Sequence, residues 1–146
     1  MYDFTACIVT YNTDQKELAQ IISCFQKTKL KFKLWISDNS EEDSLRNFIK
    51  NLSDDRIEYI FNNSNGGFGA GHNVVIKRLI EGEVEAEFHL MVNADVFFEE
   101  NTIEKIIEYS DIKKLIVRKN MLGSYDILLN FDSSINIYKY FCNLII

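Results

Sequence analysis

Short apolar runs alternate with segments of helical periodicity along the chain. The runs are rich in β-branched and aromatic residues and bounded by turn residues, as is typical of strands. We expect strands at 4–9, 32–37, 56–61 and 88–92. After each run, apolar residues recur at helical spacing, which predicts helices over 15–27, 41–52, 69–80 and 102–109. This alternation indicates an α/β fold with a mostly parallel sheet flanked by helices.

The fourth expected strand has an uninterrupted apolar run. Leu90, Met91 and Val92 do not alternate with polar residues, which predicts a strand buried on both faces of a parallel sheet. The run leads to Asn93 and Asp95, at the carboxyl edge where open α/β sheets bind ligands. Asp95 either holds a divalent cation there or caps the following helix.

Beyond the fourth helix the pattern weakens. Residues 114–119 and 126–131 are candidate strands, and 135–146 fit either a helix or a strand. The length predicts a single domain over 1–146, with the fold best supported over about 4–110. The chain ends in Asn-Leu-Ile-Ile without a polar cap, so we expect further protein beyond it.

Composition narrows the class of partner. The chain is 47% apolar and 13% aromatic, which excludes a disordered protein. A net charge of −6 argues against a nucleic-acid partner, because no basic surface is available to neutralise phosphates. No apolar run approaches the roughly 20 residues of a membrane span, and no signal sequence opens the chain. The three cysteines lack metal-ligand spacing and are typical of reduced thiols, so we expect a cytoplasmic protein.

Polar residues follow all four expected strands. Because parallel strands share one carboxyl edge, we expect these residues to converge on one crevice. Two of these residues have both a ligand-binding and a purely structural interpretation. Asp38 either accepts a hydrogen bond from a base or ribose or caps the next helix, and Tyr11 either stacks on a base or is buried with a bonded hydroxyl. Ser40 and Asp43 resemble a capping box for the helix at 41–52.

The stretch from Asn65 to Asn73 is rich in glycine. Its glycines would let the backbone approach a ligand and leave amides free at a helix N-terminus. It is not a dinucleotide-binding fingerprint, because His72 stands where a glycine is needed and the stretch follows the third strand. The alternative is a flexible turn into a helix. His72 and His89 have no partner at metal-ligand spacing, and we expect both to be structural.

These segments together resemble family 2 glycosyltransferases, especially the rhamnosyltransferase-like group that builds bacterial surface polysaccharides. The resemblance lies in the order and spacing of Val9 to Asn12, Asp38 to Ser40, Asn65 to Asn73 and Val92 to Val96. It implies a GT-A-type fold that binds a nucleotide-diphospho-sugar. Enzymes of this family are considerably longer, so we expect this chain to lack the acceptor-side half.

The resemblance also implies individual roles. The first two strand ends would line the nucleotide-base pocket, with Asp38 bonding the base, and the glycine-rich stretch would border the sugar. Asp95 would be the last aspartate of a DxD-like motif that binds Mg²⁺ or Mn²⁺, with Asn93 at its first position and Ala94 replacing the usual proline. The nucleotide-sugar-binding residues would be Thr10, Tyr11, Asn12, Asp38, Asn39, Gly67, Phe68, Gly69, Asn73, Asn93 and Asp95.

The implied activity is inverting, metal-assisted transfer from a UDP- or dTDP-sugar to a lipid-linked glycan at the inner membrane face. The family's catalytic base lies in a later acidic motif, and the late carboxylates Asp126 and Asp132 do not fit it. We therefore expect donor binding rather than full turnover, and dimerisation through the uncovered flank. The alternative is a non-catalytic remnant or interaction module of the same fold. A signalling receiver domain is disfavoured, because no acidic cluster follows the first strand.

Overall fold

The computed structural model describes residues 1–110, 116–119 and 125–128. The first four strands are β1 (Tyr2–Thr10), β2 (Phe32–Asp38), β3 (Ile57–Phe61) and β4 (Ala86–Asn93). The helices are α1 (Gln15–Gln26), α2 (Arg46–Asn51), α3 (Gly67–Ile80) and α4 (Thr102–Ser110). The predicted alternation of strand and helix is confirmed. None of these helices is long and apolar enough to cross a membrane.

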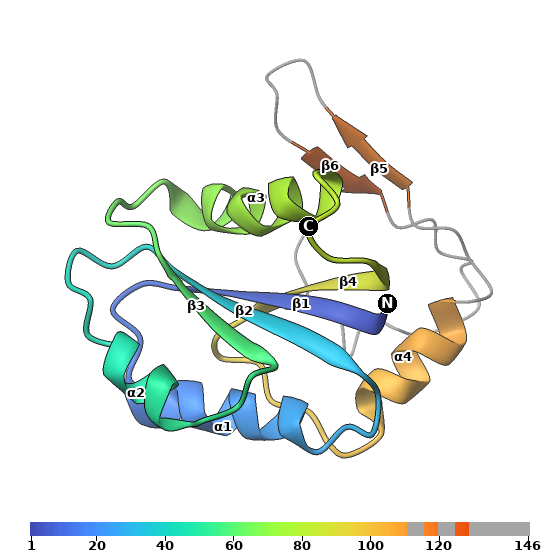
Figure 1. Ribbon diagram of the computed structural model, residues 1–146, viewed down its shortest axis with the longest axis horizontal. Coiled ribbons are helices and arrows are strands. Elements are labelled where there is room, and N and C mark those ends of the chain that lie inside the picture. Colours follow the sequence, from blue (N-terminus) through green and yellow to red (C-terminus); the bar gives the residue numbers. More distant parts are fainter. Residues whose placement is uncertain (111–115, 120–124, 129–146) are drawn as a thin grey trace.

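The four strands form one parallel sheet in the order β3-β2-β1-β4. β1 is central, because it pairs with both β2 and β4. Figure 1 shows α3 over one face of this sheet and α1, α2 and α4 over the other. The predicted α/β architecture, with helices on both faces, is therefore confirmed.

The core follows the two faces of β1. Phe4, Ala6 and Ile8 are buried toward α1, and the ring of Phe4 stacks on that of Phe32 with centroids 5.5 Å apart. On the opposite face Cys7 packs with Trp35 and Val75 of α3. Burial raises the pKa of the Cys7 thiol, so this cysteine is an inert core residue, as expected.

The prediction that the fourth strand is buried on both faces is wrong. Leu90 and Val92 are buried on the α1 side, whereas His89 and Met91 on the other side are only half-buried. The reason is that α3 lies across β1 and β2, while β4 forms an edge of this sheet. Continuous apolar residues therefore did not indicate a central strand here.

The predicted start of the second helix is also wrong. α2 begins at Arg46 rather than near Glu41, and its N-cap position, Leu45, makes no side-chain cap bond. Ser40 does not form the expected capping box, because its hydroxyl donates to the carboxylate of Asp38. The side chain of Asp43 instead pairs with Arg46. Hydrogen bonding within the loop has displaced the start of the helix toward the C-terminus.

A second, antiparallel pair is formed by β5 (Ile116–Lys119) and β6 (Tyr125–Leu128). These strands fall within or overlap the two candidate strands expected at 114–119 and 126–131. The prediction for 135–146 lies outside the described residues, as does Cys142.

Candidate functional site

The ends of the parallel strands lie side by side at one edge of the sheet. Thr10 of β1 is in register with Asp38 of β2, and Asp38 is in register with Phe61 of β3. On the other side Val9 pairs with Asn93 of β4. The polar residues predicted to converge therefore do share one edge, the carboxyl edge seen on the left of the sheet in Figure 1.

A buried carboxylate organises the centre of this edge. The side chain of Asp38 is 0% exposed and accepts hydrogen bonds from Thr10 Oγ1 at 3.0 Å and Tyr59 OH at 2.7 Å. It also accepts from the backbone amide of Ser40 at 3.1 Å and from its hydroxyl. We call Thr10, Asp38, Ser40 and Tyr59 the Asp38 network. Its donors connect β1, β2 and β3 around one acceptor.

The protonation of Tyr59 supports this arrangement. Burial, together with the hydrogen bond to the Asp38 carboxylate, raises the pKa of the Tyr59 phenol, so the hydroxyl remains a donor. The proposed capping role of Asp38 is excluded, because the next helix begins eight residues later. Because Asp38 has no exposed surface, a nucleotide base could reach its carboxylate directly only if neighbouring side chains moved.

A second set of polar contacts ties the glycine-rich helix to the strands. The side-chain amide of Asn62 donates to Ser37 Oγ at 2.9 Å and to Asn39 Oδ1 at 2.8 Å. Ser37 Oγ and Asn39 Nδ2 in turn donate to the carbonyls of Gly71 and Gly67, each at 2.9 Å. The N-terminal turn of α3 is thereby fixed over the ends of β2 and β3.

Two glycines permit this close approach. Gly67 has φ +81°, a conformation that other residues adopt only with strain. A Cβ at Gly71 would lie 2.7 Å and 2.8 Å from the two γ carbons of Val9. The glycine-rich stretch therefore has a packing role in addition to any ligand role, and the alternative of a merely flexible turn does not describe it.

Two histidines lie between α3 and the sheet, His72 on α3 itself and His89 on β4. His72 is buried with its ring 4.2 Å from that of Phe68, and Thr5 Oγ1 lies 2.8 Å from Nδ1 of His89. Burial lowers the pKa of His72 to about 3, with a further contribution from His89, and burial lowers that of His89 to about 4. Both rings are therefore neutral near pH 7. The expectation of hydrogen-bonded structural histidines is wrong for His72, because both of its ring nitrogens are buried without a hydrogen-bond partner among the described residues, as is Nε2 of His89.

The outer part of the edge is open to solvent. Tyr11 is 47% exposed, so the alternative of a buried tyrosine is excluded, and its ring is free for stacking. Asn12 is exposed with φ 52°, and its amide donates to Ser40 Oγ at 2.8 Å. This bond positions the turn that carries both side chains.

The end of β4 carries the candidate metal ligand. Asp95 is exposed and Asn93 is half-buried, and Asp95 has no hydrogen-bond or ion-pair partner among the described residues. In that part of the chain no group of three or more histidine, cysteine, aspartate or glutamate residues could hold a metal. A free carboxylate suits Mg²⁺ or Mn²⁺ when diphosphate oxygens complete the coordination.

The structure divides the predicted site residues by exposure. Buried ones include Thr10, Asp38 and Asn39; half-buried ones are Phe68, Asn73 and Asn93; exposed ones are Tyr11, Asn12, Gly67, Gly69 and Asp95. The first group builds the edge. The others surround it and are available to a ligand.

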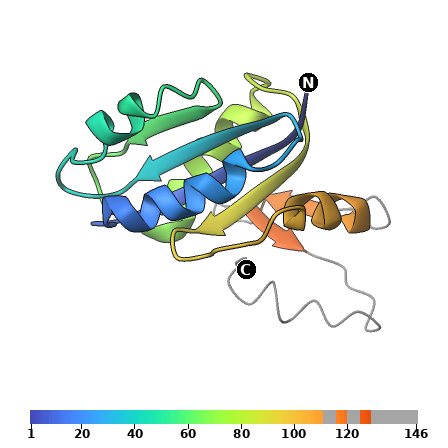
Figure 2. The ribbon, with the colours of Figure 1, turned by 90° about the horizontal axis from the view of Figure 1, so that it is seen from below.

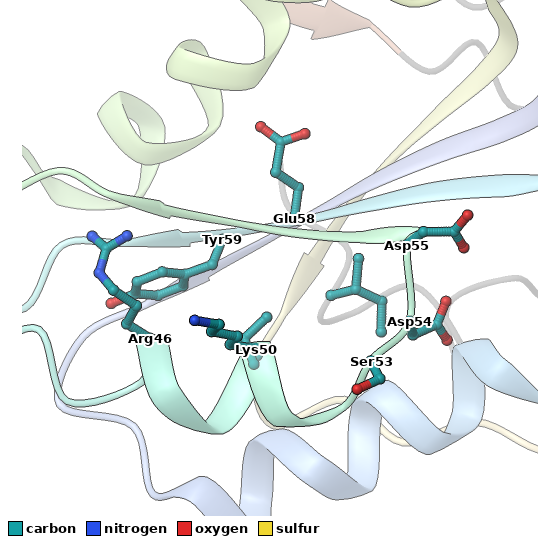
Figure 3. Close-up of a pocket in the computed structure, with 9 residues that line it drawn as sticks. Arg46, Lys50, Ser53, Asp54, Asp55, Glu58 and Tyr59 are labelled. Carbon is teal, nitrogen blue, oxygen red and sulfur yellow. The ribbon is translucent and has the colours of Figure 1, made fainter.

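A cavity of about 660 Å³ lies elsewhere, between α2 and β3 (Figure 3). Arg46 and Tyr59 both line this cavity, and the guanidinium of Arg46 lies 5.4 Å from the ring centroid of Tyr59. Asp54, also in the wall, pairs with Arg56 outside it, and this hydrogen bond lowers the pKa of Asp54. The cavity contains none of the predicted site residues, so we place the candidate site at the carboxyl edge.

Four side chains of the polar contacts at this edge were not predicted as site residues: Ser37, Ser40, Tyr59 and Asn62. Ser40 was expected to cap a helix instead. Tyr59 is a mid-strand aromatic residue that looks like ordinary packing, and Asn62 looks like a turn residue. Ser37 carried a signal, because it is a polar residue that interrupts an apolar strand immediately before Asp38. Their role depends on long-range register, which the local pattern does not contain.

Comparisons with known proteins bear on the family and the fold. The family model described as "Glycosyl transferase family 2" matches residues 5–124. Among solved structures, the chain resembles S. aureus TarS 1–349 with a TM-score of 0.61 and 22% identity, covering 79% of this chain and 34% of that one. TarS 1–349 in complex with UDP-GlcNAc gives the same score and identity, with 33% of that chain covered. No curated protein matches significantly.

The likeness to TarS confirms the predicted GT-A-type fold. The chain spans about a third or less of the length of the solved structures it matches.

Proposed function

Because this chain belongs to glycosyl transferase family 2, we propose that the carboxyl edge of its sheet binds a nucleotide-diphospho-sugar. The observation that supports this most directly is the convergence of four polar strand ends on one edge, with Asp95 exposed and unpaired among the described residues. The complex of TarS with UDP-GlcNAc shows that a protein of this fold binds such a donor.

The nucleoside would lie over the ends of β1 and β2. Tyr11 presents an exposed ring for base stacking, with Asn12 beside it. Asp38 would contribute by accepting the hydrogen bond of the Thr10 hydroxyl at 3.0 Å, with the buried Asn39 next to it in the chain. We propose a UDP- or dTDP-sugar as the donor, as the family resemblance implies.

The sugar and diphosphate would lie between α3 and the end of β4. Gly67 and Gly69 are exposed at the first turn of α3, where amide groups and the helix dipole favour anionic oxygens. Phe68 and Asn73 would border the sugar from the same helix. The contacts of Asn39 and Ser37 with α3 hold this turn in place.

A divalent cation would be held by Asp95, with Asn93 nearby and diphosphate oxygens completing the shell. When bound, it would offset the negative charge that develops on the departing nucleoside diphosphate. The exposed carboxylate of Asp95 fits a hard cation by its chemistry.

Transfer of the sugar would need an acceptor site and a catalytic base in addition to the donor side. We propose inverting transfer of a hexose or deoxyhexose, as in rhamnosyltransferase-like enzymes, to a lipid-linked glycan of a bacterial surface polysaccharide. This chain would supply the donor side. The acceptor side and the catalytic base would come from protein outside the described residues or from a second subunit, at the inner membrane face.

The test is a thermal-shift titration with UDP and dTDP, and with their sugars, with and without Mn²⁺. Ligand at about 100 times its Kd adds about 2.7 kcal/mol to the unfolding free energy, which raises Tm on the order of 5 to 10 °C for a domain of this size. The shift should require Mn²⁺ and should disappear in Asp95→Asn.

The matched control is Glu100→Gln, which neutralises another exposed carboxylate in the same loop and should leave the shift intact. Absence of any nucleotide-dependent shift in the wild-type chain would contradict the proposal. It would favour the second candidate, a non-catalytic module of the same fold.

A further inference from the structure

The segment between β4 and α4 has a regular alternation of burial. Ala94, Val96 and Phe98 pack against the main core, whereas the residue that follows each of them is exposed, namely Asp95, Phe97 and Glu99. Residues 94 and 95 form a turn and residues 96–99 have no regular secondary structure, so one side of this loop lies on the core and the other side faces solvent. We call the three outward residues the 95–99 ridge.

The direction of the ridge is set by its inward anchors. The ring of Phe98 meets that of Phe25 of α1 edge-on, with centroids 5.1 Å apart, and the amide of Val96 donates to the carbonyl of Asn93 at 3.3 Å. Figures 1 and 2 show the segment running beside α1, on the face of the sheet opposite α3. The ridge therefore starts at the candidate metal ligand and leads away from the proposed donor helix.

Phe97 is exposed in an unusual place. Among the described residues, only four large apolar side chains are strongly exposed, and Phe97 at 51% is one of them, with Tyr11, Ile80 and Met1. Tyr11 and Phe97 follow neighbouring strands, because β1 and β4 pair directly. Two exposed aromatic rings thus follow adjacent strand ends, and Phe97 comes two residues after the candidate metal ligand Asp95.

The chemistry of the ridge fits a carbohydrate. A pyranose ring has an apolar C–H face that packs on an aromatic ring, and hydroxyl groups at its rim that donate to carboxylates. The 95–99 ridge provides one ring, Phe97, with a carboxylate on each side in the chain. An apolar peptide or lipid would gain nothing from the two carboxylates, and a nucleic acid would be repelled by them.

We propose that the 95–99 ridge is a sugar-binding subsite for the acceptor glycan. The ring of Phe97 would stack on the sugar, and the Glu99 carboxylate would accept a hydrogen bond from a sugar hydroxyl. This inference rests on the proposed function, since the donor would occupy the opposite side of Asp95. It assigns part of acceptor recognition to the described part of this chain.

The experiment is saturation-transfer-difference NMR on the intact chain with the methyl glycosides of glucose, N-acetylglucosamine and rhamnose. At least one glycoside should receive saturation from the wild-type protein, and Phe97→Ala should weaken its binding by about threefold to tenfold, the range of one aromatic contact. Glu99→Gln should weaken binding less. Ile80→Ala removes an equally exposed apolar side chain at the far end of α3 and should change nothing.

Each failure has a distinct signature. Absence of saturation transfer to every glycoside, or equal transfer in Phe97→Ala and the wild type, overturns the subsite. A larger fall in Tm for Phe97→Ala than for Ile80→Ala also overturns it, because Phe97 would then be packed against the chain itself. The nucleotide-dependent thermal shift, measured on the same variants, should be unchanged, and its absence in the wild type would instead count against the donor site.

Discussion

Each side of the carboxyl edge carries an aspartate, and the two carboxylates have opposite environments. Asp38, on the β2 side, has no exposed surface and accepts four hydrogen bonds. Asp95, on the β4 side, is exposed and has no partner among the described residues. The Asp38 carboxylate is engaged in hydrogen bonds within the protein, and the Asp95 carboxylate is available to a ligand.

The difference shows how the site is organised. A buried carboxylate needs its donors, because each unsatisfied polar group in the interior destabilises the folded state. An exposed carboxylate is hydrated and contributes little to stability. The β2 side therefore provides rigidity, which fixes Thr10 and the first turn of α3, while the β4 side provides groups that a ligand can reach. Substitutions on the two sides should separate stability from binding.

The largest effect is expected for Asp38→Ala. This change leaves the hydroxyls of Thr10, Ser40 and Tyr59 without their acceptor, and we expect the unfolding free energy to fall by about 3 to 5 kcal/mol. Urea denaturation measures it. Glu41→Ala, in the same loop but exposed and without a side-chain partner among the described residues, is the control and should change stability by about 0.5 kcal/mol or less. Equal effects of the two variants would remove the distinction between the two sides.

The sequence patterns predicted much of this architecture. They did not show which polar residues stabilise the edge and which are exposed to a ligand. Alternating strand and helix patterns predicted the parallel sheet, since periodicity reports burial locally. Parallel topology then implied that Thr10, Asp38, Asn93 and Asp95 share one edge. Local patterns were sufficient for the strands and helices, and the general rule that parallel strands share one carboxyl edge then placed their last residues together.

Features set by distant contacts were missed. The start of α2 was misplaced because Ser40 bonds to Asp38 rather than capping a helix. The exposure of β4 was missed because it depends on where α3 crosses the sheet. The donors to Asp38 come from β1, the following loop and β3, so no segment of the sequence shows that they meet. Tyr59 could be recognised only from the register of β2 and β3.

The next effect concerns the contact between α3 and β1. Gly71→Ala would place a Cβ within 2.8 Å of both γ carbons of Val9, and we expect a loss of about 1 to 3 kcal/mol from overpacking. Gly69 has open space around its Cβ position, so Gly69→Ala should instead stabilise the helix by up to about 1 kcal/mol. Thermal unfolding of the two variants measures this contrast. Equal Tm values would mean that α3 is not held against β1 as described.

Acidification should weaken the α3 side of the sheet. His72 and His89 have pKa values of about 3 and about 4 when folded, against about 6.5 when unfolded. Because the unfolded chain binds more protons between these values, stability is complete above about pH 6.5 and declines as the pH falls. Each histidine should account for roughly 1 to 2 kcal/mol between about pH 7 and pH 5.

The histidine contribution can be isolated by substitution. In His72→Gln and His89→Gln the dependence of unfolding free energy on pH should become shallower in this range, whatever the stability of each variant at pH 7. Urea denaturation at several pH values measures the slope. An unchanged slope in both variants would show that the two rings titrate normally in the folded state.

The smallest effect on stability is expected for Asp95→Asn, and this makes it the most informative change on the β4 side. No described residue depends on Asp95 as a partner, so the unfolding free energy without ligand should change by about 0.5 kcal/mol or less. The same variant should lose the Mn²⁺-dependent stabilisation by nucleotide. A destabilisation close to that of Asp38→Ala would show that the Asp95 side chain is also engaged in interactions within the protein. The described part of the edge would then have no free carboxylate at the end of β4.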